Sequence, residues 1–461
     1  MISFSLLCVL LVLGNVIRLK WRLMQRLYLP SCVIGGVLGL IVIQAFRLAA
    51  GSGGWFETFY SHINEWTAPW SQIPGLLINI VFACLFLGVK IPGIRTIWQR
   101  SGPQVAYGQF VAWGQYFVAI ALWLFVLRAV FPDLPAMFAG VLPVGFEGGH
   151  GTAGGLGPTF EQYNWSAGKD FALTSATFGI VSAIVIGTVL INWAVRKGYT
   201  VHAKSPVDMT EDDTIGIIPV GQRPSAGRIT INTDIIEAMS VHLGLVGIAC
   251  LIGIIIQKSL IGFENSIEPM AKLGLLKGFP LFPLCMIGGL TVQKFFDKYD
   301  KHNLIDLGLI RRIQNTALDF LVVAAIATIR IELVAKGIVP LILLAVVGIA
   351  WNVGAVMFIA KRFLPDAWFE RAIAEMGQSM GVTATGLLLL RVVDPDYKTS
   401  AADAFAYKQI IHEPFMGGGL WTGMAIPLLA IKGGWFVLAI STSALIIWLA
   451  VLFVFKSKQK P

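Results

Sequence analysis

Two polar stretches contain the residue types best suited to hold a solute at membrane depth. VGFEGGHGTAGGLGP at 144–158 is nearly half glycine, and SMGVTATG at 379–386 is rich in hydroxyls. Glycine lets bare backbone approach a ligand closely. Carbonyl groups of unwound backbone bind cations and half-helix N-termini bind carboxylates, and no covalent bond is made or broken. The candidate substrate ligands are Gly148, Gly149, His150, Gly151, Thr152, Ser379, Thr383, Thr385 and Arg391.

Long apolar blocks surround both stretches. Hydrophobic residues make up 56% of the 461 residues and charged residues 13%, about half the charged share of a soluble domain. Because about 20 apolar residues span a bilayer, we predict an all-α polytopic membrane protein with about eleven crossings. They lie near 2–17, 28–46, 72–89, 104–127, 171–195, 236–256, 278–293, 315–335, 338–360, 403–431 and 435–455.

The remaining composition narrows the class of protein. The first apolar run lacks a preceding basic region and a small-residue cleavage site, so we expect a helix there and not a signal peptide. The five cysteines lie inside apolar blocks without disulfide or zinc spacing. The net charge of +9 fits basic cytoplasmic loops better than nucleic-acid binding. The sequence contains no Walker lysine motif and no HExxH, so neither ATP drive nor an enzyme is favoured.

The distribution of basic residues predicts a re-entrant hairpin. Basic residues cluster at 18–26, at 90–100 and in the polar linker at 196–235, which favours a cytoplasmic location for all three and an outside N-terminus. The linker then lies inside only if 135–158 enters and leaves on one face. Eight glycines in that segment would weaken a crossing helix by up to about 1 kcal/mol each. Close helix packing through small residues is the alternative.

Three pairs of segments repeat in the same order along the chain. The pairs are LPSCVIGG (29–36) with FPLCMIGG (282–289), INIVFACLFLGVKI (78–91) with LDFLVVAAIATIRI (318–331), and GGHGTAGG (148–155) with SMGVTATG (379–386). Five crossings precede the linker, so the second copy begins on the opposite face and the repeats are inverted. Inverted repeats with interrupted helices are typical of secondary transporters, which bind solutes near the bilayer midplane.

An ion gradient is the expected energy source for such a transporter. The repeats and the linker divide the chain into four parts. The parts are a first repeat at 1–195 with the hairpin 135–158, a cytoplasmic linker at 196–235, a second repeat at 236–431 with a hairpin at 374–391, and an additional helix and tail at 432–461.

The GGHGT stretch at 148–152, the LPSCVIGG start of the second helix and the LDFLVVAAIA segment resemble the bacterial sodium–glutamate symporter family. The resemblance extends over roughly residues 2–431 and is patchy between these motifs. It implies Na⁺-coupled uptake of glutamate across the inner membrane, two inverted halves with re-entrant loops, a homodimer and an elevator-like motion. The second hairpin, HEPF at 412–415 and the apolar helix at 435–455 depart from the family's pattern, which leaves the exact substrate open.

Candidate Na⁺ ligands are oxygens inside apolar runs. Asp319 is a carboxylate in such a run, where a charge is costly and usually functional. It is expected to bind Na⁺ or to pair with Arg330 or with the second hairpin, unless it lies at a helix end in the membrane interface. Asn79, its repeat counterpart, and Thr383 complete the predicted set.

Other ionisable residues keep more than one possible role. His150 is expected to contact substrate, relay a proton or lock the hairpin through a hydrogen bond. Arg391 is expected to pair with a substrate carboxylate or to be a cytoplasmic charge. Glu147 is expected at the outer mouth, and His412 and Glu413 are expected to pair with an ammonium, a proton or each other.

The expected function is Na⁺-coupled symport of glutamate or a related small anionic amino or organic acid across the inner membrane. A proton- or sodium-coupled transporter of di- or tricarboxylates is one alternative, and an uncoupled channel or exporter is the alternative from another class. The expected coupling ion is Na⁺, and the expected partners are the anionic solute, the lipid bilayer and a second copy of the chain.

Overall fold

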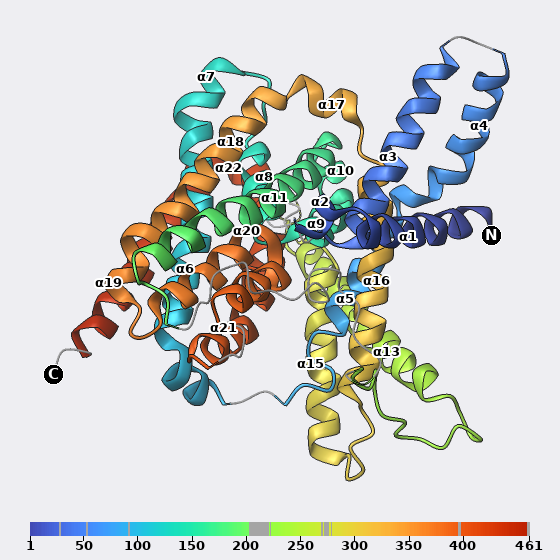
Figure 1. Ribbon diagram of the computed structural model, residues 1–461. Helices are drawn as coiled ribbons and strands as arrows, with labels where there is room; N and C mark the ends of the chain where they lie inside the picture. The colour runs from blue at the N-terminus through green and yellow to red at the C-terminus, as the bar shows by residue number, and fades with distance from the viewer. Residues whose placement is uncertain are drawn as a thin grey trace. The chain divides into compact units, whose positions relative to one another are not determined.

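The structure is a computed structural model that describes residues 1–26, 29–51, 54–90, 93–201, 221, 223–268, 271, 276–277, 279–394 and 398–458. The regular elements of this described part are all helices (Figure 1). Eight helical spans within it are long and apolar enough to cross a membrane. This confirms a polytopic helical membrane protein, whereas the number of eleven crossings stays a prediction. Much of the predicted linker, 202–220, lies outside the described residues.

The chain forms two compact units, and each draws on both halves of the sequence. Unit one consists of Met1–Ile91, Gly154–Pro158 and Glu211–Arg330. Unit two consists of Pro92–Ala153, Thr159–Thr210 and Ile331–Pro461.

In unit one, α3 packs against α1 and α16, and α15 packs against α13 and α5. The predicted crossing at 72–89 is helical only over the eleven residues of α5, which rise about 16 Å. This is about half of the apolar thickness of a bilayer. The helices are α1 (Ile2–Lys20), α2 (Arg22–Arg26), α3 (Ser31–Ala50), α4 (Trp55–Thr67), η1 (Ala68–Ser71), α5 (Ile73–Ala83), α13 (Ala238–Ser266), α15 (Phe282–Tyr299) and α16 (Leu307–Ala327).

Glycines of the repeated segments in unit one make matching helix contacts. A Cβ at Gly36 would lie 3.3 Å from the carbonyl oxygen of Val323, and a Cβ at Gly289 would lie 2.2 Å from that of Ala83. Val323 and Ala83 occupy equivalent positions in the repeated segments 318–331 and 78–91. Gly36 of α3 therefore packs on Val323 of α16, and Gly289 of α15 packs on the equivalent residue, Ala83 of α5. A side chain at either glycine would force the helices apart.

In unit two, α6 packs against α8, α18, α21 and α22, and α20 packs against α11 and α21. The π-helical segments η2 and η5 follow α6 and α18. The helices are α6 (Ile94–Leu122), η2 (Trp123–Leu127), α7 (Arg128–Val130), α8 (Met137–Phe146), α11 (Ala167–Arg196), α17 (Ile331–Lys336), α18 (Ile338–Gly354), η5 (Ala355–Ala360), α19 (Lys361–Phe363), α20 (Trp368–Val393), α21 (Ala401–Phe415) and α22 (Leu420–Lys458). α9 (Gly149–Gly155) and α10 (Gly157–Gln162) are divided between the two units, because Gly154–Pro158 belongs to unit one.

The glycine-rich stretch is interrupted and folds back. α8 ends at Phe146, and Gly149 opens α9 with a φ of +66°, a conformation that glycine adopts at little cost. The rings of Phe138 and Trp165 lie 6.2 Å apart, although a straight helix of that length would separate them by about 40 Å. The segment around 144–158 is therefore not a continuous rod.

α20 is a second helical hairpin. Its helical backbone breaks at Gly381 and at Val382, whose φ is +69°. A Cβ at Gly377 would lie 2.8 Å from the Cα of Gly386, whereas nine residues of straight helix span about 13 Å. The two arms of α20 consequently pack side by side, with the tip at 381–382.

Candidate solute-binding site

The tips of the two hairpins touch each other. A Cβ at Gly149 would lie 2.4 Å from Cγ1 of Val382, so the first tip has no room for a side chain there. On the second tip, the carbonyl oxygen of Met380 would lie 2.2 Å from a Cβ at Gly179 of α11. Glycines thus allow both tips and α11 to meet at backbone distance.

Glu147 joins the first tip to the second. Gln378 Nε2 donates to Glu147 Oε2 at 2.9 Å, across 231 positions of sequence, which is the offset between the repeated segments 148–155 and 379–386. Gln115 Nε2 of α6 donates to Glu147 Oε1 at 3.3 Å, and His412 Nε2 lies 3.1 Å from Oε2. The predicted position of Glu147 at an exposed outer mouth is wrong: its side chain is fully buried, because these partners cover and satisfy the carboxylate.

A buried ion pair anchors the second hairpin to α21. Lys408 Nζ donates to Glu375 Oε1 at 2.5 Å, and both side chains are fully buried. The ammonium also donates to Oε1 of Gln378 and of Gln409, at 2.9 Å each. A Cβ at Gly108 of α6 would lie 2.4 Å from Lys408 Cε, so this glycine makes room for the pair. Full hydrogen bonding is the condition under which a buried ion pair is tolerated.

Glu147, Glu375, Lys408 and His412 form one hydrogen-bonded set, which we call the charged cluster. Gln378 bridges its two ends, since the Gln378 amide donates to Glu147 and its carbonyl accepts from Lys408. The cluster connects α6, the α8–α9 junction, α20 and α21, all within unit two.

Several predicted ligands lie beside this cluster. The Ser379 carbonyl accepts from Gln115 Nε2 at 2.6 Å, and Thr383 Oγ1 accepts from Gln409 Nε2 at 2.5 Å. Thr385 donates to the carbonyl of Gly381 within its own hairpin, the local bond that Thr often makes. Thus Ser379 and Thr383 of the second tip are held by glutamines that also bond the charged cluster.

The predicted residues of the first tip are buried, apart from the half-buried Gly148. They are Gly148, Gly149, His150, Gly151 and Thr152. His150 Nε2 lies 3.0 Å from Thr177 Oγ1 of α11, and this bond supports the role of His150 in locking the hairpin.

Three predicted site residues lie elsewhere. Arg391 is exposed in the last turn of α20, about 13 Å along that arm from Val382. Asp319 and Asn79 belong to unit one. Asp319 is hydrogen-bonded to Cys32, and Asn79 Nδ2 donates to the carbonyl of Gly75 in its own helix at 2.8 Å.

The residues predicted from the sequence did not include Lys408, Glu375 and Gln378. A usable signal existed, because Lys408 and His412 are four residues apart and therefore share one face of an apolar helix. Ionisable residues inside such helices are functional candidates by default.

A second ion pair closes the open end of α20, and its carboxylate, Asp366, lies between two apolar spans. Arg371 Nη2 donates to Asp366 Oδ1 at 2.8 Å, and Ser400 also hydrogen-bonds Asp366. Burial raises the pKa of the Asp366 carboxyl, but the Ser400 hydrogen bond and the Arg371 charge outweigh it and lower this pKa below its usual range.

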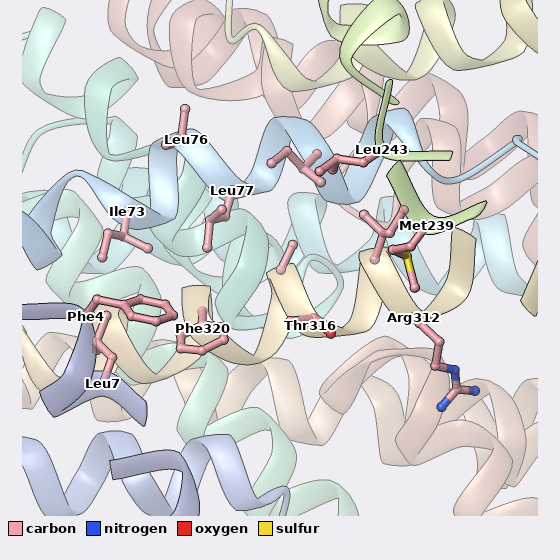
Figure 2. Close-up of a pocket in the computed structure, with 13 residues that line it drawn as sticks. Phe4, Leu7, Ile73, Leu76, Leu77, Met239, Leu243, Arg312, Thr316 and Phe320 are labelled. Carbon is pink, nitrogen blue, oxygen red and sulfur yellow. The ribbon is translucent and has the colours of Figure 1, made fainter. Parts of the chain in front are cut away.

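Unit one contains a cavity of different character. It has a volume of about 520 Å³ and an almost entirely apolar lining that includes Leu76 and the stacked rings of Phe4 and Phe320. Figure 2 shows the guanidinium of Arg312 directed away from the apolar side chains. Such a lining offers few polar partners to an anion or to Na⁺, so the charged cluster is the better candidate site.

The comparisons with known proteins agree with the sequence resemblance. The profile of the sodium/glutamate symporter family matches residues 110–399, more than half of the chain. The chain is 23% identical over 389 residues to the sodium/glutamate symporters of Escherichia coli (strain K12) and Shigella flexneri, covering 83% of this chain and 86% of each relative. No solved structure matches. Symporters of this family are transporters and not enzymes, and the family implies Na⁺ as the coupling ion. The chain belongs to the sodium/glutamate symporter family and is a multi-pass protein of the inner membrane.

Proposed function

We propose that the protein uses the Na⁺ gradient to take up glutamate or a closely related small anionic amino or organic acid. Family membership supports the coupling ion and the class of solute. The observation that carries the proposal is the meeting of two folded-back tips at a buried charged cluster. A solute held between such tips is released when they separate.

The proposed architecture is a pair of inverted repeats with eleven crossings, divided at 1–195, 196–235, 236–431 and 432–461. The hairpins at 135–158 and 374–391 are proposed to be re-entrant from opposite faces. The matched contacts of Gly36 and Gly289, and the 231-residue offset between Glu147 and Gln378, support the repeat. We expect a homodimer with an elevator-like motion, because the resemblance to the symporter family implies both.

The proposed substrate ligands are the backbone of Gly148, Gly149 and Gly151 and the hydroxyls of the second tip. Lys408 joins them, because its ammonium donates to Gln378, the residue that links the second tip to Glu147, and complements a carboxylate. The predicted set at His150, Thr152, Ser379, Thr383, Thr385 and Arg391 remains part of this proposal. Asp319 and Asn79 of unit one and Thr383 of unit two are each proposed separately as a Na⁺ ligand, since hard cations prefer oxygen.

Proteoliposomes test the function directly. Purified protein should take up labelled glutamate when Na⁺ is outside and K⁺ inside, and uptake should stop when K⁺ replaces the external Na⁺. As a control variant, Gly354→Ala should show the same Na⁺-dependent uptake as the wild type, because Gly354 is helical and a Cβ there meets nothing within 4 Å. Equal uptake in Na⁺ and K⁺ would contradict Na⁺ coupling, and glutamate uptake without any ion gradient would indicate a channel.

A transporter of di- or tricarboxylates is the second candidate, favoured by the buried ammonium of Lys408 and the imidazole of His412 in one cluster. Thermal stabilisation with a panel of amino acids and carboxylates separates the two. A ligand at 100 times its Kd stabilises the native state by about 2.7 kcal/mol. Na⁺-dependent stabilisation by glutamate and not by citrate supports the first proposal, and the reverse supports the second.

A further inference from the structure

The charged cluster carries an unbalanced negative charge when His412 is neutral. Glu147 and Glu375 contribute two negative charges, and Lys408 contributes one positive charge that is paired with Glu375 at 2.5 Å. The partners of Glu147 apart from His412 are the uncharged amides of Gln378 and Gln115. A buried charge without an opposite charge is unfavourable, so one further positive charge would balance the cluster.

His412 is built to accept that charge as a proton. Its Nε2 lies 3.1 Å from Glu147 Oε2, and its Nδ1 lies 3.3 Å from Nε2 of Gln109 on α6. A glutamine amide donates through its nitrogen to a neutral ring and, after a half-turn, accepts through its oxygen from a protonated ring. Oε1 of Gln109 is buried without a partner among the described residues, so this oxygen is available for the second arrangement.

The groups around His412 oppose one another. Burial disfavours a proton on the ring most, and Lys408, one turn away on α21, also repels it, whereas Glu147 at the α8–α9 junction and Glu375 of α20 attract it. α6 adds two phenols, since Tyr116 lies near Glu147 and Tyr107 near Glu375. α22, which also packs on α21, contributes the uncharged Thr422 beside Tyr116. Glu147 is the only acid of this set that touches the ring in the described structure.

We infer that the Glu147–His412 pair binds one proton together with the anionic solute, so that a proton accompanies Na⁺ and the anion through the transport cycle. This inference rests on the proposed function. An anion that enters between the tips adds negative charge beside His412 and raises its affinity for a proton. Separation of the tips breaks the Gln378–Glu147 hydrogen bond and opens the pair to water, where the proton is released. Histidine suits this role because its charge changes near neutral pH.

Proton uptake on solute binding is the primary test. Purified protein in weakly buffered Na⁺ solution with a pH indicator should take up to one proton per chain when glutamate is added near pH 7. His412→Gln should bind glutamate without proton uptake. His62→Gln, at an exposed histidine of α4, should behave as the wild type.

Transport measurements complete the test. At a fixed Na⁺ gradient, an external pH lower than the internal pH should raise wild-type uptake several-fold and leave His412→Gln unchanged. If His412→Gln does not fold, Gln109→Met provides a second test. This variant keeps the Glu147–His412 pair but removes the Gln109 oxygen that would accept a hydrogen bond from protonated Nδ1, so half-maximal proton uptake should move to lower pH. Na⁺-driven glutamate uptake without proton movement would overturn this inference alone. Absence of Na⁺-dependent glutamate binding would instead overturn the proposed function.

Discussion

The two hairpins reach the same meeting point by different chemistry. The first breaks its helix at Gly149, where a positive φ is cheap, and brings a single carboxylate, Glu147. The second breaks at Val382, a β-branched residue for which a φ of +69° is costly, and is fixed to α21 through the Glu375–Lys408 pair. The comparison indicates that the first tip relies on backbone freedom, and that the second relies on surrounding contacts that impose an unfavourable conformation.

The largest expected effect comes from the anchor of the second hairpin. Lys408→Met leaves Glu375 charged and buried, so it should lower the free energy of unfolding by about 3–5 kcal/mol. The double variant Lys408→Met/Glu375→Gln should recover most of that loss, because no buried charge remains unpaired. Thermal unfolding in detergent measures both, and equal stability of the single and double variants would contradict the assigned ion pair.

The first tip should be intolerant of any side chain. Gly149→Ala imposes a positive φ on alanine, at about 1–2 kcal/mol, and places a Cβ 2.4 Å from Val382 Cγ1. Na⁺-driven uptake should fall while membrane insertion remains normal. Adding Val382→Ala removes the clash and should restore part of the uptake; no recovery in the double variant would argue against contact between the tips.

Relief of the strain at the second tip should produce a smaller change of opposite sign. Val382→Gly removes a conformational cost of about 1–3 kcal/mol and adds up to about 1 kcal/mol of backbone entropy, so stability should rise by roughly 1 kcal/mol. Val189→Gly, at an exposed helical position of α11, should instead lower the melting temperature. A decrease for both variants would show that Val382 is not strained.

The smallest effect concerns the open end of the second hairpin. The pKa of Asp366 is lower in the folded than in the unfolded protein, so its contribution to stability is present above about pH 4 and is lost as the pH falls through the folded pKa. Asp366→Asn should therefore cost less than about 1 kcal/mol at pH 7, because the carboxylate is half-exposed. The difference from wild type should disappear under acidic conditions, and a constant difference would exclude the charge as its cause.

The sequence predicted the helical membrane class and the interruption near 144–158, since apolar length and glycine content act locally. It also predicted the symporter family through the GGHGT stretch. The charged cluster could not be predicted because its members are far apart in the sequence. Gln378 follows Glu147 by 231 positions, and Lys408 lies 30 positions further on, in the helix after the second hairpin, so only folding brings them together. The break at Val382 had no local signal, because valine does not favour a positive φ.

Cross-linking of the two tips tests the central claim most directly. In a variant without the five native cysteines, Gly149→Cys and Val382→Cys should form a disulfide rapidly, because a Cβ at Gly149 would lie 3.9 Å from that of Val382. Na⁺ together with glutamate should speed the reaction, since bound solutes keep the tips together and are released when the tips separate. Cross-linking no faster than for a Gly149→Cys/Arg391→Cys pair, or a rate indifferent to Na⁺ and glutamate, would contradict the account.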